Sequence, residues 1–246
     1  MSSAVIQLAL AIIPTILAIT LHEAAHGYAA LALGDDTARQ AGRLSLNPIR
    51  HIDRFGTIIL PGFLLIFQLL TLHHVAFMFG WAKPVPVDAR RFHNPRRGMA
   101  WVAAAGPAMN FALAWLGGVL MPAANGPDGG SFEALDASLA THPYLGLFLF
   151  YFILTNLVLG LFNLLPIPPL DGGRIAVGVL PLALARRWAQ LERVGILIVL
   201  LVVFILPRFL DFDPVGEALN TILPWALRTV FWLSGHNVGD DGAGTL

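Results

Sequence analysis

The sequence predicts an all-α polytopic membrane protein, and both its composition and the distribution of its charges indicate this class. Apolar residues fill 57% of the 246 positions, charged residues fill 12%, and the mean hydropathy is +0.72. A soluble domain carries about twice that share of charged residues. Fifteen basic residues balance fifteen acidic ones, so no net field favours nucleic acid as a partner. We therefore expect a lipid bilayer as the environment and a single domain over residues 1–246.

The charges fall in clusters, and the stretches between them are long enough to cross a bilayer. A spanning helix needs about 20 predominantly apolar residues. Five to six membrane segments are available, at residues 4–33, 55–79, 98–127, 137–170, 194–207 and 218–235. The first of these has no basic residues before it, so we expect a transmembrane helix rather than a cleavable signal peptide. The segments over about 190–234 are expected to be accessory helices.

The basic residues predict the orientation of these segments. Thirteen of the fifteen lie in residues 34–54, 80–97 and 170–193. Basic loops lie on the cytoplasmic side of a membrane. All three groups share that side only if the stretch 55–79 enters the membrane and returns without crossing, and Pro61-Gly62 could bend such a hairpin. We expect this re-entrant arrangement, together with short extended or β edges in the cytoplasmic loops.

A candidate metal site lies in the first segment, at His22-Glu23-Ala24-Ala25-His26. Residues four apart on a helix stand one turn above each other, so the two imidazoles would face one point. Two nitrogens at this spacing can bind one zinc ion, and Glu23 lies close enough to accept a proton from zinc-bound water. Polar groups inside an apolar helix are costly unless they face a cavity, a partner or a metal.

A catalytic zinc site needs at least one more protein ligand, and the best candidate is Asp171. No third histidine follows His26 at the spacing of the soluble zinc proteases. Asp171 stands in residues 163–174, where three prolines end a predicted helix before two glycines. Asp171 could instead serve as the N-cap of the next helix. The loop charges place all three proposed ligands on one side of the membrane.

Five motifs together resemble the site-2 protease family of intramembrane zinc metalloproteases, in its compact bacterial form. They lie at residues 22–26, 42–57, 80–87, 105–110 and 163–174. They occur in the order found in the family and spread over about 4–174, which we expect to be the catalytic core. We expect neither an inserted PDZ domain nor a CBS tail, because the soluble stretches of the sequence are too short.

The resemblance implies roles for particular residues. His22, His26 and Asp171 would bind one Zn²⁺, and Glu23 would be the general base. Asn163 would position the substrate or the oxyanion. Asn110 is a second candidate for that role, although an amide inside an apolar helix more often bonds to a neighbouring helix.

The resemblance also implies hydrolysis of peptide bonds in or near the transmembrane segments of other membrane proteins. The expected location is the bacterial cytoplasmic membrane, with the active site toward the cytoplasm. Residues 85–87 read as an extended edge that could pair with an unwound substrate. The alternative is a non-proteolytic zinc-binding scaffold or carrier, which the presence of Glu23 disfavours. The sequence predicts neither the substrate nor the oligomeric state.

Overall fold

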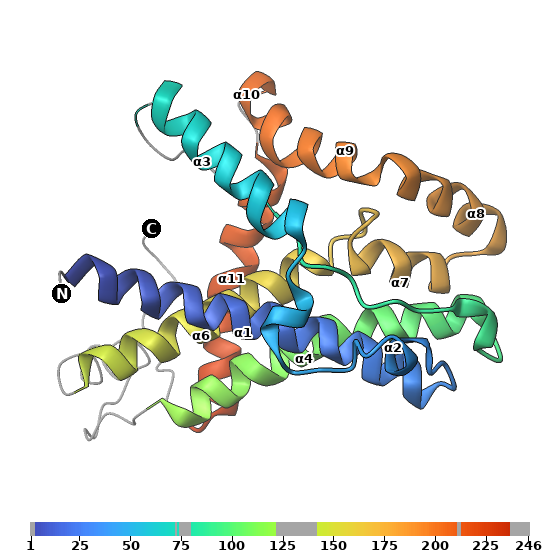
Figure 1. Cartoon of the computed structure of the whole chain (residues 1–246), viewed down its shortest axis with the longest axis horizontal. Helices are drawn as coiled ribbons and strands as arrows, with labels where there is room; N and C mark the ends of the chain where they lie inside the picture. Colours follow the sequence, from blue (N-terminus) through green and yellow to red (C-terminus); the bar gives the residue numbers. More distant parts are fainter. Residues whose placement is uncertain (1–2, 72, 74–79, 122–141, 211–212, 237–246) are drawn as a thin grey trace.

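The protein is built from helices, as Figure 1 shows for the computed structural model, which describes residues 3–71, 73, 80–121, 142–210 and 213–236. The α-helices are α1 (Ser3–Ala32), α2 (Thr37–Gln40), α3 (Leu60–Thr71), α4 (Pro95–Leu120), α6 (Pro143–Asn163), α7 (Asp171–Val179), α8 (Leu182–Gln190), α9 (Gly195–Leu200), α10 (Leu206–Leu210) and α11 (Pro214–Leu233). Short 3₁₀ helices cover Pro48–His51, Ala89–Arg91 and Leu191–Val194, and π-helical turns cover Arg54–Ile59 and Leu201–Ile205. The all-α class is confirmed.

Four helices in the described ranges are long and apolar enough to cross a membrane: Ala9–Ala32, Arg54–Thr71, Pro95–Leu120 and Pro143–Asn163. The protein is therefore an integral membrane protein. The two further segments predicted at 194–207 and 218–235 are not among these four and stay a prediction. The stretch 194–207 is divided into a 3₁₀ turn, a short α-helix and a π-helical turn, and α11 does not meet the same criterion.

The predicted hairpin at 55–79 leaves and rejoins the rest of the protein at one place. The backbone N–H of Trp81 donates to the carbonyl of Gly56 at 3.2 Å, and Thr57 Oγ1 donates to the carbonyl of Trp81 at 2.8 Å. A segment that crossed once would have its two ends on opposite faces. These contacts agree with the re-entrant arrangement, although most of its return, at 72 and 74–79, lies outside the described residues.

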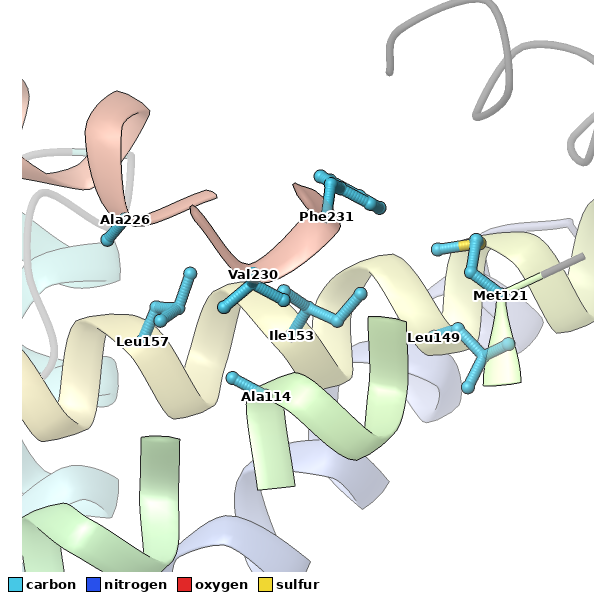
Figure 2. Packing of buried hydrophobic residues seen from close by; sticks show 8 residues of the cluster. All are labelled: Ala114, Met121, Leu149, Ile153, Leu157, Ala226, Val230 and Phe231. Atoms are coloured by element: carbon cyan, nitrogen blue, oxygen red, sulfur yellow. The ribbon is translucent and has the colours of Figure 1, made fainter. Parts of the chain in front are cut away.

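The hydrophobic core lies between α4, α6 and α11 (Figure 2). Ala114 on α4 faces Ile153 and Leu157 on α6, and Val230 on α11 closes the cluster. These side chains are small or branched, which allows the helices to pack closely. Helix α4 also contacts α1 and α7. It thereby holds together the two elements that carry the proposed metal ligands.

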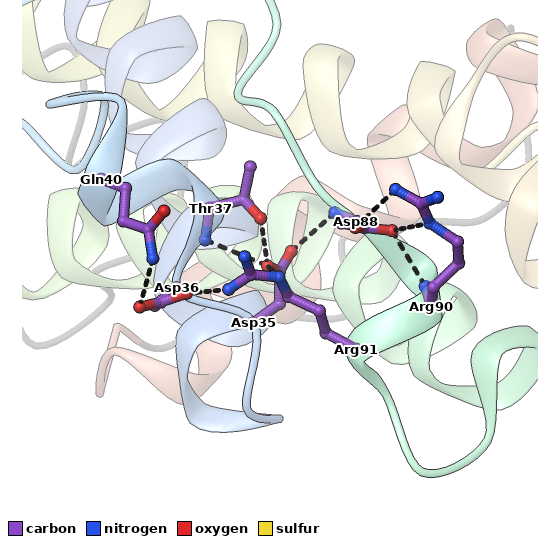
Figure 3. A network of polar contacts seen from close by, with 7 residues as sticks. All are labelled: Asp35, Asp36, Thr37, Gln40, Asp88, Arg90 and Arg91. Carbon is purple, nitrogen blue, oxygen red and sulfur yellow. Dashed lines mark hydrogen bonds and ion pairs between the residues drawn. The ribbon is translucent and has the colours of Figure 1, made fainter.

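Polar contacts join the end of α1 to the segment before α4 (Figure 3). Asp35 is fully buried and accepts hydrogen bonds from the backbone N–H groups of Thr37 at 3.0 Å and Asp88 at 2.7 Å. Arg91 forms ion pairs with both Asp35 and Asp36. Burial would raise the pKa of Asp35, but the hydrogen bonds from Thr37 and Asp88 and the charge of Arg91 together outweigh it. The pKa therefore lies below its ordinary value of 3.8.

Replacing Asp35 by Asn should lower the Tm at neutral pH, and the effect should shrink in acid. The folded protein binds a proton at Asp35 less readily than the unfolded chain does, so the carboxylate stabilises the fold above pH 3.8. This stabilisation is lost as the pH falls through the lower, folded-state pKa. Thermal unfolding of the variant and the wild type at about pH 7 and about pH 3 tests the sign. An equal Tm difference between the two proteins at both pH values would contradict this expectation.

Candidate metal centre

Two helices that are distant in sequence supply the candidate ligands. Helix α1 carries His22 and His26 on one face, and Asp171 is the first residue of α7. Prolines end α6 and shape the turn that leads to α7. Gly172 allows this turn to close, because a Cβ there would clash with the carbonyl oxygens of Leu164 and Leu165. The residue that precedes α7 as its N-cap is Leu170, so Asp171 is not the cap of this helix.

The three side chains converge on one point. His22 Nε2 lies 3.1 Å from Asp171 Oδ2, and His26 Nε2 lies 3.3 Å from the same oxygen. The two Nε2 atoms are 3.1 Å apart. All three side chains are largely shielded from solvent, with 7%, 12% and 9% of their surfaces exposed for His22, His26 and Asp171. The structure therefore brings the three predicted ligands together within the reach of a single ion.

A chain of buried amides fixes the proton position on His22. Asn156 Nδ2 donates to the carbonyl of Phe152 at 2.8 Å, so its Oδ1 must face Asn110. Asn110 Nδ2 donates to that oxygen at 2.8 Å, which turns its own Oδ1 toward His22 Nδ1, 2.5 Å away. A backbone carbonyl can only accept a hydrogen bond, so it sets the direction of the whole chain. In neutral His22 the proton consequently sits on Nδ1, and Nε2 carries a lone pair.

His26 is oriented in the same way by a different partner. Its Nδ1 lies 2.7 Å from the carbonyl of Val102, so Nδ1 is the donor and Nε2 again carries the lone pair. Asp171 Oδ2, buried beside both nitrogens, has no hydrogen-bond donor. Three acceptor atoms thus face one another, and such atoms repel each other unless a cation or a proton lies between them. Two imidazoles and one carboxylate suit zinc, so these residues fit the metal that the sequence implies.

Glu23 lies beside the ligands and is held by the segment that precedes α4. Its Oε2 accepts a hydrogen bond from the backbone N–H of Val85 at 3.2 Å. The neighbours Pro84 and Pro86 have no N–H, so Val85 supplies the only backbone donor of this tripeptide. No strand occurs in the described parts of the chain; residues 85–87 have no regular secondary structure, and their role as an extended edge for substrate stays a prediction. The segment restrains the carboxylate of Glu23.

The two asparagines predicted to contact substrate have different positions. Asn110 is fully buried, with its carbonyl oxygen toward His22 and its amide nitrogen toward Asn156. It therefore stands behind a metal ligand, and a contact with substrate or oxyanion does not fit this position. Asn163 is only partly buried, and its amide donates to the carbonyl of Leu159 at 3.0 Å. The role of Asn163 stays a prediction.

Sequence reasoning missed Gly106, which lies directly against the imidazoles. A Cβ at this position would lie 2.5 Å from Cε1 of His26 and 2.6 Å from Cε1 of His22. We expect Gly106→Ala to displace both rings and to lower zinc affinity by about 10- to 100-fold, as measured by chelator competition. Gly117→Ala is the matched control, because its Cβ would meet Ile153 in the core instead. Equal zinc affinity in the two variants would contradict this role of Gly106.

Replacing Asn110 by Leu should also weaken zinc binding. The change removes the acceptor that holds the proton on His22 Nδ1, so the proton can move to Nε2 and occupy the lone pair that would bind zinc. We expect zinc affinity to fall about tenfold or more. Asn110→Asp retains an acceptor and should therefore recover part of the zinc affinity. Leu157→Ala, a packing change in the same core, should lower the Tm without changing zinc affinity. Unchanged zinc affinity in folded Asn110→Leu would show that the chain of buried amides does not orient His22 for zinc binding.

Comparisons with known proteins agree with this site. The model for Peptidase family M50 matches residues 10–206. The chain is 40% identical over 196 residues to a Bacillus subtilis (strain 168) protein named "Putative zinc metalloprotease YwhC", and the match covers 80% of each chain. No solved structure matches significantly. The chain belongs to peptidase family M50, the site-2 protease family of zinc metalloproteases.

Proposed function

We propose that the protein is an intramembrane protease with one zinc ion held by His22, His26 and Asp171, and with Glu23 as its general base. The observation that carries this proposal is the convergence of three lone-pair atoms beside Glu23, two of them from a helix apolar enough to span a membrane. A site for zinc alone would not need a carboxylate next to its first ligand. The family membership supports the same chemistry.

Glu23 would transfer the protons of the reaction. Bound zinc would lower the pKa of its water toward 7 and so supply a nucleophile at neutral pH. The role of Glu23 would be to accept a proton from the attacking water and to return that proton to the leaving amine as the C–N bond breaks. The N–H of Val85 restricts rotation of the Glu23 carboxylate, which keeps the base near the attacking water. Asn163 is proposed to help orient the substrate or the oxyanion.

The proposed substrates are membrane proteins that are cut in or near a transmembrane segment. A helical segment must unwind locally, because its carbonyls are hydrogen-bonded along the helix. The distribution of the basic loops supports the proposal that the site lies on the cytoplasmic side of a bacterial inner membrane. We further propose that residues 4–174 form the catalytic core, with the helices of 190–234 as accessory elements.

Cleavage of a synthetic single-pass peptide by the reconstituted protein tests this function. We expect a product whose new ends map within or beside the apolar stretch by mass spectrometry. Removal of the metal with 1,10-phenanthroline should stop cleavage, and one equivalent of zinc should restore it. Cleavage that survives complete removal of zinc would overturn the proposal, and so would cleavage confined to soluble proteins.

A further inference from the structure

Arg43 bridges two segments that are distant in sequence, the loop after α2 and the segment that precedes α4. Its Nη2 donates to the carbonyl of Lys83 at 2.7 Å and to that of Pro84 at 3.4 Å. Its Nη1 donates to the carbonyl of Arg50. A guanidinium presents donors on two edges of a rigid plane, so one side chain can hold both segments at a fixed spacing. The metal centre described above does not use this side chain.

The loop that carries Arg43 is itself anchored to the helical body. The backbone N–H of Arg43 donates to the carbonyl of Ala38, a fully buried residue, at 2.8 Å. Arg50 Nη1 donates to the carbonyl of Gly42 at 2.6 Å. Gly42 has a φ of +62°, a left-handed conformation that favours glycine. Arg43 therefore acts from a fixed base, and the segment at 83–85 is the part that it restrains.

The restrained segment ends on the proposed general base. The carbonyl of Pro84 and the N–H of Val85 belong to one planar peptide group, and in a trans peptide they point in opposite directions. Arg43 contacts the carbonyl side, and Glu23 Oε2 accepts from the N–H side at 3.2 Å. The peptide group thus lies between a cation and a carboxylate, and the charge of Arg43 strengthens the hydrogen bond that the N–H donates. A Cβ at Gly27, one turn after Glu23, would lie 3.0 Å from Val85 Cγ1, so Val85 also packs directly against α1.

We propose that Arg43 positions the general base Glu23 through the peptide group between Pro84 and Val85. This inference rests on the proposed function. Arg43 acts on Glu23 through Val85, so it is a positioning residue and not a catalytic one. A carboxylate that loses its fixed donor can rotate away from the attacking water, and a small displacement of a catalytic group costs a large factor in rate. The candidate zinc ligands of α1 are oriented by α4 and α6 instead, so zinc should stay bound when Arg43 is changed.

Kinetics of cleavage of the single-pass peptide separate positioning of the base from binding of the substrate. Arg43→Gln removes the charge and one edge of donors, and we expect kcat to fall about 10- to 100-fold while KM and zinc affinity stay unchanged. Arg43→Lys should recover only part of the rate, because an ammonium does not match the planar fork of donors. Arg39→Gln is the matched control, because Arg39 is exposed on the adjoining α2, and it should cleave at the wild-type rate. A raised KM at unchanged kcat in Arg43→Gln would assign Arg43 to substrate binding and overturn the proposal.

A double-mutant cycle tests whether Arg43 acts through the N–H of Val85. Val85→Pro removes this N–H, whereas Val85→Ala keeps it and removes only the packing against α1. We expect Val85→Pro to have a much lower kcat than Val85→Ala. Adding Arg43→Gln to Val85→Pro should then lower kcat by no more than about twofold further. Losses in kcat that multiply fully in the double variant would overturn the proposal.

Hydrogen exchange tests the same contact without requiring cleavage. The amide of Val85 should exchange severalfold faster in Arg43→Gln than in the wild type or in Arg39→Gln, as measured by mass spectrometry of the reconstituted protein. Unchanged exchange at Val85 in Arg43→Gln would overturn the proposal, whether or not the protein is a protease. Absence of cleavage by the wild type would count against the proposed function, and the exchange of this amide would still decide whether Arg43 holds Val85.

Discussion

Replacing Glu23 by Gln is expected to abolish hydrolysis while zinc stays bound. Glutamine has nearly the same shape and can still accept the hydrogen bond from Val85, but it cannot take a proton from water. Loss of a general base lowers rates by about 10²- to 10⁴-fold. Cleavage of the single-pass peptide should therefore fall by at least about 100-fold, and zinc content by metal analysis should equal that of the wild type.

The Glu23→Gln variant also separates a protease from a zinc-binding scaffold. A scaffold or carrier needs the ligands but not the base, so it would keep its function after this change. Glu192→Gln is a matched control, because Glu192 forms an exposed ion pair with Arg174 and takes no part in the site. Cleavage by Glu23→Gln at the rate of this control would exclude Glu23 as the base. Loss of zinc from Glu23→Gln would instead mean that Glu23 is a ligand.

Replacing Asp171 by Ala should remove the metal. Asp171 Oδ2 is the only oxygen in the cluster of three ligand atoms, and both imidazole nitrogens lie within 3.3 Å of it. Two histidines alone leave zinc with too few protein ligands for a stable catalytic site. We expect the zinc content to fall from about one per chain to near zero after mild chelation, with cleavage lost in parallel.

The control for Asp171→Ala is a second acidic residue at the start of a helix. Asp213 caps α11 by accepting a hydrogen bond from the N–H of Gly216 at 2.8 Å, so Asp213→Ala removes a cap but no ligand. The Asp213 variant should lose about 0.5–2 kcal/mol of stability and keep its zinc. Undiminished zinc in Asp171→Ala would show that the third ligand lies elsewhere.

The sequence predicted the residues that converge at the candidate site because the pattern that carries two of them is local. The spacing of His22 and His26 places both rings on one helical face wherever that helix lies. Asp171 followed from the proline-broken turn and from the side of the membrane to which the loop charges assigned it. The all-α class and the first helix, expected at 4–33 and found at Ser3–Ala32, could be predicted from composition and hydropathy alone.

The hydrogen bonds that orient the proposed ligands and Glu23 could not be predicted, because they depend on how the helices are rotated about their axes. Asn110 was recognised as an amide in an apolar helix, but only the packing of α4 against α1 and α6 joins it to Asn156 in a hydrogen-bonded chain that ends on His22. The contact of Val85 with Glu23 joins residues 62 positions apart in sequence. No local pattern encodes such a pairing. The break of the helix at 201–205 is likewise absent from the hydropathy of that stretch.

The order of the ligands along the chain has a consequence for biosynthesis. The ribosome adds about 5–20 residues per second, so Asp171 is made on the order of ten seconds after the histidines of α1. During that interval a nascent chain holds His22 and His26 in the bilayer without their third ligand. Docking of α7 against α4 completes the set. On the proposed mechanism, newly inserted protein would therefore be unable to cleave neighbouring membrane proteins until translation has passed Asp171.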